Sequence, residues 1–244
     1  MAASPATTAP RDHGPARPWL SCVGPFALFL VLGLLEPVAG DGGLAGLLGI
    51  PRGFYPAIYA LRLAITAILL AACWPALRGW VGRPSWWPPL VGLALVVPWI
   101  VLAGLQREAG WGVPATRAAF DPFLHYGDST ALVPYLVVRG LGLVVIVPIV
   151  EELFLRGFLM RYVIDDERFW AVPYGTVTVA ALVACTVYAA ATHPSEAVAA
   201  VGWFGITSGI AAATRRPIDS ILAHAATNLA LGGYVLVTGS WWLV

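Results

Sequence analysis

Charged residues are scarce in this chain. Asp, Glu, Lys and Arg make up only 11% of its 244 residues, whereas soluble domains carry about 25%, so the composition excludes an ordinary soluble protein. Lysine is absent, and all fourteen basic residues are arginine, which we attribute to compositional bias rather than to mechanism. The formal net charge of +1 offers no basic excess of the kind that nucleic acid binding needs.

Cysteine is also scarce, and its spacing carries no motif. Cys22, Cys73 and Cys185 lie far apart, each within an apolar run. No CxxC or Cys/His spacing of a zinc site is present. We therefore expect buried free thiols, with no zinc site of that kind and no cysteine nucleophile.

Apolar residues, by contrast, are abundant. They make up 59% of the chain, the mean hydropathy is +0.79, and many runs approach the ~20 residues that cross a membrane as a helix. The pattern predicts an all-α, polytopic transmembrane helix bundle with about seven spans, and six or eight also fit. The expected spans are 19–35, 54–74, 87–105, 132–160, 171–191, 197–213 and 218–237.

Three regions follow from this pattern. Residues 1–18 are rich in Ala, Pro, Thr and Arg and predict a flexible tail. Residues 19–131 form N-terminal membrane helices with a long polar loop at 106–131, and residues 132–244 form the membrane core that carries the candidate site.

Two arginines before the first span and small residues at 37–40 also fit a signal peptide. We favour a membrane helix because a further span follows.

Arginine counts set the expected orientation, because positive residues favour the inner side. The N-terminus inside and the C-terminus outside give the larger inner count. The predicted inner segments then hold Arg11, Arg17, Arg78, Arg83, Arg161, Arg168, Arg215 and Arg216, and the outer segments hold Arg52, Arg107 and Arg117.

Three charges within six residues interrupt the apolar span at 132–160: Glu151, Glu152 and Arg156. Each charge at bilayer depth costs roughly 2.5–3.5 kcal/mol even on the lenient insertion scale, which indicates a functional use. Glu152 and Arg156 have the i,i+4 spacing of a helical ion pair. Glu151 points about 100° away around the helix, so it is available as a general base.

Further polar groups fall in the same half of the chain. His193 lies near the end of one span, and His224 and Asn228 share a helix face in the last one. A glutamate base, an imidazole beside it and a His–Asn pair that donates to an oxyanion would suit water attack on an amide carbonyl. Taken singly, these residues also fit an ion-pair lock, a helix cap and interhelical hydrogen bonds.

The order Glu-Glu-x-x-x-Arg, then a His, then His-x-x-x-Asn resembles the CPBP family of CAAX prenyl proteases and bacteriocin-processing enzymes, also called the Abi family. The resemblance covers residues 138–237. Four segments are most similar to bacterial CAAX-protease-related proteins that accompany exosortase sorting systems. They are the residues around Glu151, Thr192-His193-Pro194, the stretch after His224, and Phe120-Asp121-Pro122.

The resemblance implies an intramembrane endopeptidase of the glutamate type that uses no cofactor. Glu151 would activate water with help from His193, while the His–Asn pair would bind the oxyanion. The implied site residues are Glu151, His193, His224 and Asn228, with Glu152 and Arg156 in support. A zinc ion held by two Glu and two His is the alternative.

The implied partners are a membrane-anchored protein or peptide substrate and the lipid bilayer of a bacterial inner membrane, with no nucleic acid. The chain departs from the family pattern at Ala189, where the family has Phe four residues before the first His. That departure supports a rival interpretation, a non-catalytic scaffold or immunity-type member. A second rival is a proton-coupled transporter that uses the acidic pair as a relay.

The depth of the candidate residues sets a geometric condition. Glu151 lies about ten residues from the end of its span, and His193 lies near the far end of the next. They meet only if the connector after Arg161 extends beyond the membrane or the helices are staggered. We therefore expect staggered helix ends and a cavity that opens toward that connector, on the predicted inner side.

Overall fold

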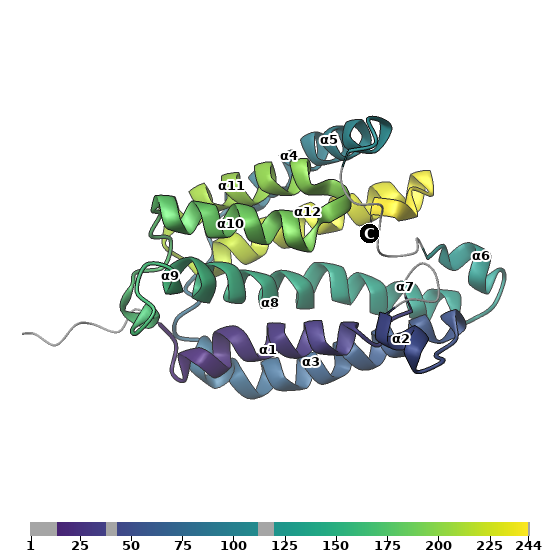
Figure 1. Cartoon of the computed structure of the whole chain (residues 1–244), viewed down its shortest axis with the longest axis horizontal. Helices are drawn as coiled ribbons and strands as arrows, with labels where there is room; N and C mark the ends of the chain where they lie inside the picture. The colour runs from purple at the N-terminus through teal and green to yellow at the C-terminus, as the bar shows by residue number, and fades with distance from the viewer. Residues whose placement is uncertain (1–13, 38–42, 112–119, 244) are drawn as a thin grey trace, which may run out of the picture.

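The computed structural model describes residues 14–37, 43–111 and 120–243, and these fold into helices with no strand among them (Figure 1). The all-α prediction is confirmed. Residues 1–13 of the expected tail and 112–119 of the expected polar loop lie outside the described residues.

Long apolar helices dominate the described chain. Five are long and apolar enough to cross a membrane: Arg52–Leu77, Pro88–Glu108, Leu132–Tyr162, Pro194–Thr214 and Pro217–Thr238. Two shorter apolar helices, Pro18–Gly33 and Val179–Thr192, occupy the positions of the remaining expected spans. The polytopic bundle is thus confirmed, while the number of crossings and their orientation stay predictions.

The elements carry the labels of Figure 1. The first half contains α1 (Pro18–Gly33), α2 (Gly43–Leu47), η1 (Arg52–Phe54), α3 (Tyr55–Leu77), α4 (Pro88–Ala94), α5 (Val96–Glu108) and α6 (Pro122–Tyr126). The middle contains α7 (Leu132–Leu141), η2 (Gly142–Ile146), α8 (Val147–Phe154), η3 (Leu155–Leu159), α9 (Met160–Tyr162) and η4 (Phe169–Ala171). The last part contains α10 (Val179–Thr192), η5 (Pro194–Glu196), α11 (Ala197–Thr214), α12 (Pro217–Thr238) and η6 (Trp241–Leu243).

Local sequence sets the helix ends. Proline opens α1, α4, α6 and α12, because its missing N–H costs nothing in a first turn. The Asp121 carboxylate caps α6 by accepting from the backbone N–H groups of Phe123 and Leu124. Gly239 ends α12 with φ 69°, a left-handed conformation that suits glycine.

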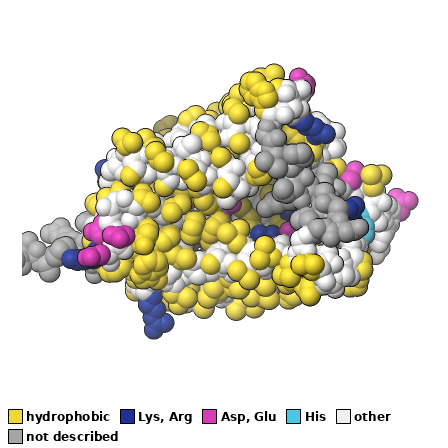
Figure 2. All heavy atoms as spheres, viewed as in Figure 1, with side chains coloured by type: hydrophobic (Ala, Val, Ile, Leu, Met, Phe, Trp, Pro, Cys, Tyr) yellow, Lys and Arg dark blue, Asp and Glu magenta, His cyan; other side chains and the backbone are white. Residues whose placement is uncertain are grey.

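The helices pack around one long continuous helix, Leu132–Tyr162, which we call the central rod. Figure 1 shows α7 to α9 running unbroken across the middle, with α1 and α3 along one side and α10, α11 and α12 on the other. Helix α4 packs against α12, and α5 packs against α11. Hydrophobic side chains cover most of the face in Figure 2, with charges mainly toward its two ends, as a bundle surrounded by lipid requires.

The connector between α9 and α10 is longer than predicted. The fully buried Arg161 guanidinium donates to the carbonyls of Gly157, Trp170 and Val172 at 2.8–2.9 Å, which ties this segment to the end of the central rod. Helix α10 therefore begins at Val179, after the Thr178 cap, and not at the predicted residue 171. The apolar run concealed this boundary, because residues 171–178 are apolar enough to pass for membrane helix.

Candidate active site

Both glutamates of the sequence motif lie in α8, in the middle of the central rod. Glu152 is 1% exposed and Glu151 is 9% exposed. Two π-helical turns, η2 and η3, flank this short α-helix. Such turns are rare and often mark functional sites, since they shift side chains around the helix and free backbone groups.

Glu152 is held on both of its oxygens. Its Oε2 accepts from Arg156 one turn later, and its Oε1 lies 3.2 Å from His224 Nδ1. Arg156 also donates to the Phe204 carbonyl at 2.9 Å and to the Thr207 hydroxyl. The Glu152–Arg156 ion pair thus neutralises both charges and joins the central rod to α11. These contacts fix the position of the Glu152 carboxylate.

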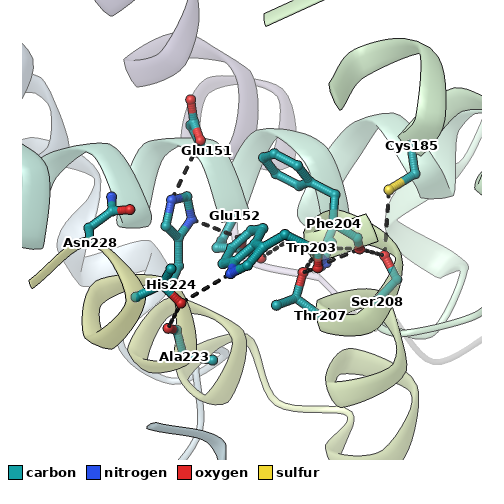
Figure 3. A network of polar contacts seen from close by, with 12 residues as sticks. Glu151, Glu152, Cys185, Trp203, Phe204, Thr207, Ser208, Ala223, His224 and Asn228 are labelled. Atoms are coloured by element: carbon teal, nitrogen blue, oxygen red, sulfur yellow. Dashed lines mark hydrogen bonds and ion pairs between the residues drawn. The ribbon is translucent and has the colours of Figure 1, made fainter. Parts of the chain in front are cut away.

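His224 lies between the two glutamates, as Figure 3 shows. Its Nε2 is 3.8 Å from Glu151 Oε2. Because Glu152 is ion-paired with Arg156 and can only accept, we assign the proton of the Nδ1–Glu152 hydrogen bond to His224. The second ring nitrogen then faces Glu151, where it accepts a proton or, once protonated, donates one.

Residues outside the sequence motif fix the His224 ring. The Trp203 ring packs edge-on against it, with 4.6 Å between centroids, and Trp203 Nε1 donates to the Thr227 hydroxyl at 3.0 Å. Thr227 in turn donates to the Gly92 carbonyl at 2.8 Å. A Cβ on Gly92 would lie 2.0 Å from the Ala223 carbonyl oxygen, so only glycine lets α4 approach α12 this closely.

Asn228 lies one turn after His224 on the same face, as the spacing predicted, and both residues line one cavity. The Asn228 amide donates to the Leu143 carbonyl at 2.8 Å. Leu143 belongs to the π-helical turn η2. An asparagine amide has two N–H donors, so this bond orients the side chain and leaves a second donor.

His193 follows the last residue of α10. Its Nδ1 lies 2.9 Å from the Thr192 hydroxyl, and its ring centroid is 5.6 Å from those of Trp99 and Phe204. Gln106 holds the next turn in place: its amide donates to the Pro194 carbonyl at 3.3 Å and accepts from the Val198 N–H at 2.9 Å.

Ala189, the position that departs from the family pattern, is fully buried one turn before His193. The adjacent Tyr188 packs edge-on against Phe204 at 5.6 Å, and Phe204 also contacts the His193 ring. Aromatic side chains from α10 and α11 therefore surround this part of the site.

A cavity of about 960 Å³ brings the candidate residues together. Glu151, His193, His224 and Asn228 all line it. Its other lining residues include Glu36, Arg107, Trp111 and Trp241, which lie at the end of the bundle opposite the α9–α10 connector. The prediction that the cavity opens toward that connector is wrong. Glu151 and His193 nevertheless line the same cavity, because α10 begins only at Val179 and His193 follows its last residue. The stagger of the helix ends stays a prediction.

The sequence missed several residues that shape the site: Gly92, Trp99, Gln106, Trp203, Thr207 and Thr227. Most of them lie within apolar runs and belong to no motif. Gln106 could have been found from the sequence, because a glutamine at the end of an apolar span needs hydrogen-bond partners once it is buried.

The donor groups do not suit a metal. Across residues 14–37, 43–111 and 120–243, no three His, Cys, Asp or Glu side chains are arranged to hold an ion. Arg156 already engages Glu152, one of the four ligands that a zinc site would use. No step below therefore passes through zinc.

A family model described as "Rce1-like: Type II CAAX prenyl endopeptidase Rce1-like" matches residues 133–230. No curated protein and no solved structure gives a significant match. The matched region contains all six candidate residues. The matched stretch, which is less than half of the chain, is similar to the CAAX protease family, and it includes helices that are long and apolar enough to cross a membrane.

Proposed function

We propose that this protein is an intramembrane endopeptidase that hydrolyses a peptide bond of a membrane-associated protein with water activated by Glu151. The observation that carries the proposal is that the side chains of two adjacent glutamates have different surroundings. Glu152 is held by Arg156 and His224, whereas Glu151 lines the cavity with one oxygen facing His224.

The proposed chemistry consumes one water molecule. Glu151 takes a proton from the water, and the resulting hydroxide attacks the carbonyl carbon of the substrate. His224, when protonated on Nε2 as well as on Nδ1, and the second N–H of Asn228 donate to the oxyanion that forms, a contribution typically worth 10²–10³ in rate for one donor. As the C–N bond breaks, Glu151 returns the proton to the departing amine.

His193 assists from the same cavity. Its hydrogen bond with Thr192 and its contacts with Trp99 and Phe204 hold the ring, which suits a group that orients the attacking water. Glu152 and Arg156 act as positioning residues, because they hold His224 and join the central rod to α11. We propose that the reaction uses no metal or other cofactor.

The proposed substrate is the C-terminal region of a membrane-anchored protein in a bacterial inner membrane, of the kind handled by exosortase-linked systems. The cavity contains several aromatic residues, including Trp99, Trp203 and Trp241, and such walls suit an apolar peptide.

Both rival functions remain open to test. A transporter needs polar groups that continue across the bundle. Arg156, however, does not line the cavity and is held by Glu152 and by the Phe204 carbonyl. A non-catalytic scaffold would share the fold and would keep its function in Glu151→Gln.

A cleavage assay in detergent tests the proposal. Candidate membrane-anchored C-terminal peptides are incubated with wild type, Glu151→Gln and Glu167→Gln, each with and without a chelator. Glu167 is an exposed glutamate in the α9–α10 connector and serves as the matched control. We expect cleavage by wild type and Glu167→Gln, insensitive to chelator, and none by Glu151→Gln. Loss of activity with chelator and recovery with zinc would mean a metalloprotease.

A further inference from the structure

One arginine inside the bundle differs from the others. Arg62 pairs with Glu36 at 2.7 Å, Arg156 pairs with Glu152, and Arg161 donates to three carbonyls. Arg139 lies on α7, and its guanidinium sits 4.7 Å above the Tyr59 ring. No carboxylate in the described part of the chain lies within ion-pair distance of it.

Within the described residues, the titratable groups around Arg139 do not compensate its charge. Its titratable neighbours are Tyr55, Tyr59 and Tyr135, and tyrosine is neutral near pH 7. Contact with an aromatic face stabilises a cation much less than an anionic partner does. A cation in an apolar span without an anionic partner is by default a functional site, and here the missing partner is an anion.

Arg139 faces the same cavity as Glu151. The cavity is lined along the central rod by Arg139, Leu143, Val147 and Glu151, every fourth residue. In a regular α-helix with 3.6 residues per turn, side chains four residues apart point in slightly different directions around the axis. The π-helical turn η2, between Arg139 and Glu151, has more residues per turn and reduces this rotation. Twelve residues separate the two charges, about 18 Å along the axis.

We propose that Arg139 binds the free C-terminal carboxylate of a peptide substrate whose scissile bond lies at Glu151. The inference rests on the proposed function and specifies its substrate. An arginine guanidinium matches a carboxylate with two parallel hydrogen bonds. An extended peptide covers about 3.3–3.6 Å per residue, so the segment between the scissile bond and the terminus is roughly five residues or fewer.

The position of Arg139 favours a peptide over a lipid phosphate. It lies seven residues into α7, about 10 Å from the helix start, whereas lipid phosphates lie at the membrane surface. An anion at this depth must come in through the cavity. A peptide terminus that enters with the scissile segment meets this condition.

Binding to an inactive protein tests the carboxylate subsite without needing cleavage. The probe is a fluorescent decapeptide with an apolar C-terminal half, made once with a free carboxylate and once as the C-terminal amide. Fluorescence polarisation measures both with Glu151→Gln in detergent. We expect the amide to bind about 10- to 100-fold more weakly, as the loss of a charge-assisted hydrogen bond implies.

Variants then assign the preference to one residue. Adding Arg139→Gln to Glu151→Gln should make acid and amide bind alike, and Arg139→Lys should keep part of the preference. Arg78→Gln, at an exposed arginine just after the far end of α3, is the matched control and should keep all of it. The tighter binding of the acid peptide is measured with Arg139 in place, so the test still gives a result if an Arg139 variant misfolds.

Each outcome separates this inference from the proposed function. Equal binding of acid and amide, binding of neither, or a preference that depends on Arg107 at the cavity mouth would overturn the subsite. Displacement of both peptides by short-chain phosphatidic acid, with no acid preference, would assign Arg139 to lipid phosphate. A clear acid preference without cleavage by wild type would overturn the protease proposal and leave the subsite standing.

Discussion

Replacing Arg156 with methionine should destabilise the bundle strongly. Arg156 is 2% exposed and Glu152 is 1% exposed, and removing one partner of a buried pair leaves an uncompensated charge. Such changes cost about 3–5 kcal/mol. His224, at 3.2 Å from Glu152, can take over part of the pairing as its imidazolium, so we expect a cost nearer 3 kcal/mol.

The double variant Glu152→Gln with Arg156→Met isolates the pair. Both charges are then gone, and what remains lost is the donation of Arg156 to the Phe204 carbonyl and the Thr207 hydroxyl. Two such hydrogen bonds contribute about 1–3 kcal/mol. The double variant should therefore be more stable than Arg156→Met alone.

Unfolding by SDS in mixed micelles, followed through the eleven tryptophans, measures these free energies. Glu151→Gln is the control, because Glu151 adjoins Glu152 but faces His224, whereas Glu152 pairs with Arg156, and it should change stability by less than about 1 kcal/mol. If Arg156→Met costs less than that, or if the double variant costs the sum of the two single changes, the buried pair does not hold α11 to the central rod.

Two further predictions concern the α4–α12 contact and the oxyanion site. Gly92→Ala should destabilise by about 1–3 kcal/mol, as overpacking does, whereas Gly232→Ala on α12, with no neighbour within 4 Å of the added Cβ, should not; equal melting temperatures would contradict this. Asn228→Ala should lower kcat of the proposed peptidase about 10²–10³-fold with KM little changed, and a rise in KM alone would mean that Asn228 binds substrate rather than the oxyanion.

Much of the fold was readable from composition and run length. Few charges and long apolar runs predict helices in a membrane, because a buried backbone must satisfy its own hydrogen bonds there. The spans at 54–74 and 197–213 lie within helices of the structure, and the span at 87–105 does so except for its first residue. The start of α10 was not readable, because Arg161 holds an apolar connector through backbone carbonyls that no side-chain pattern reveals.

The candidate site was predictable where helix spacing decides geometry. The pairing of Glu152 with Arg156 and the shared face of His224 and Asn228 both follow from i,i+4 spacing. Contacts between helices were not predictable in this way. The approach of α4 to α12 at Gly92, and the placement of His224 between the two glutamates, depend on packing that a single sequence does not encode in any local pattern.

The catalytic role of Glu151 is the central claim, and cleavage in liposomes tests it most directly. Wild type and Glu151→Gln are reconstituted with a membrane-anchored peptide, and the fragments are weighed by mass spectrometry. The account predicts new amino and carboxyl termini at one bond with wild type, and intact peptide with a folded Glu151→Gln. Equal cleavage by both proteins, or none by folded wild type across the tested peptides, would contradict it.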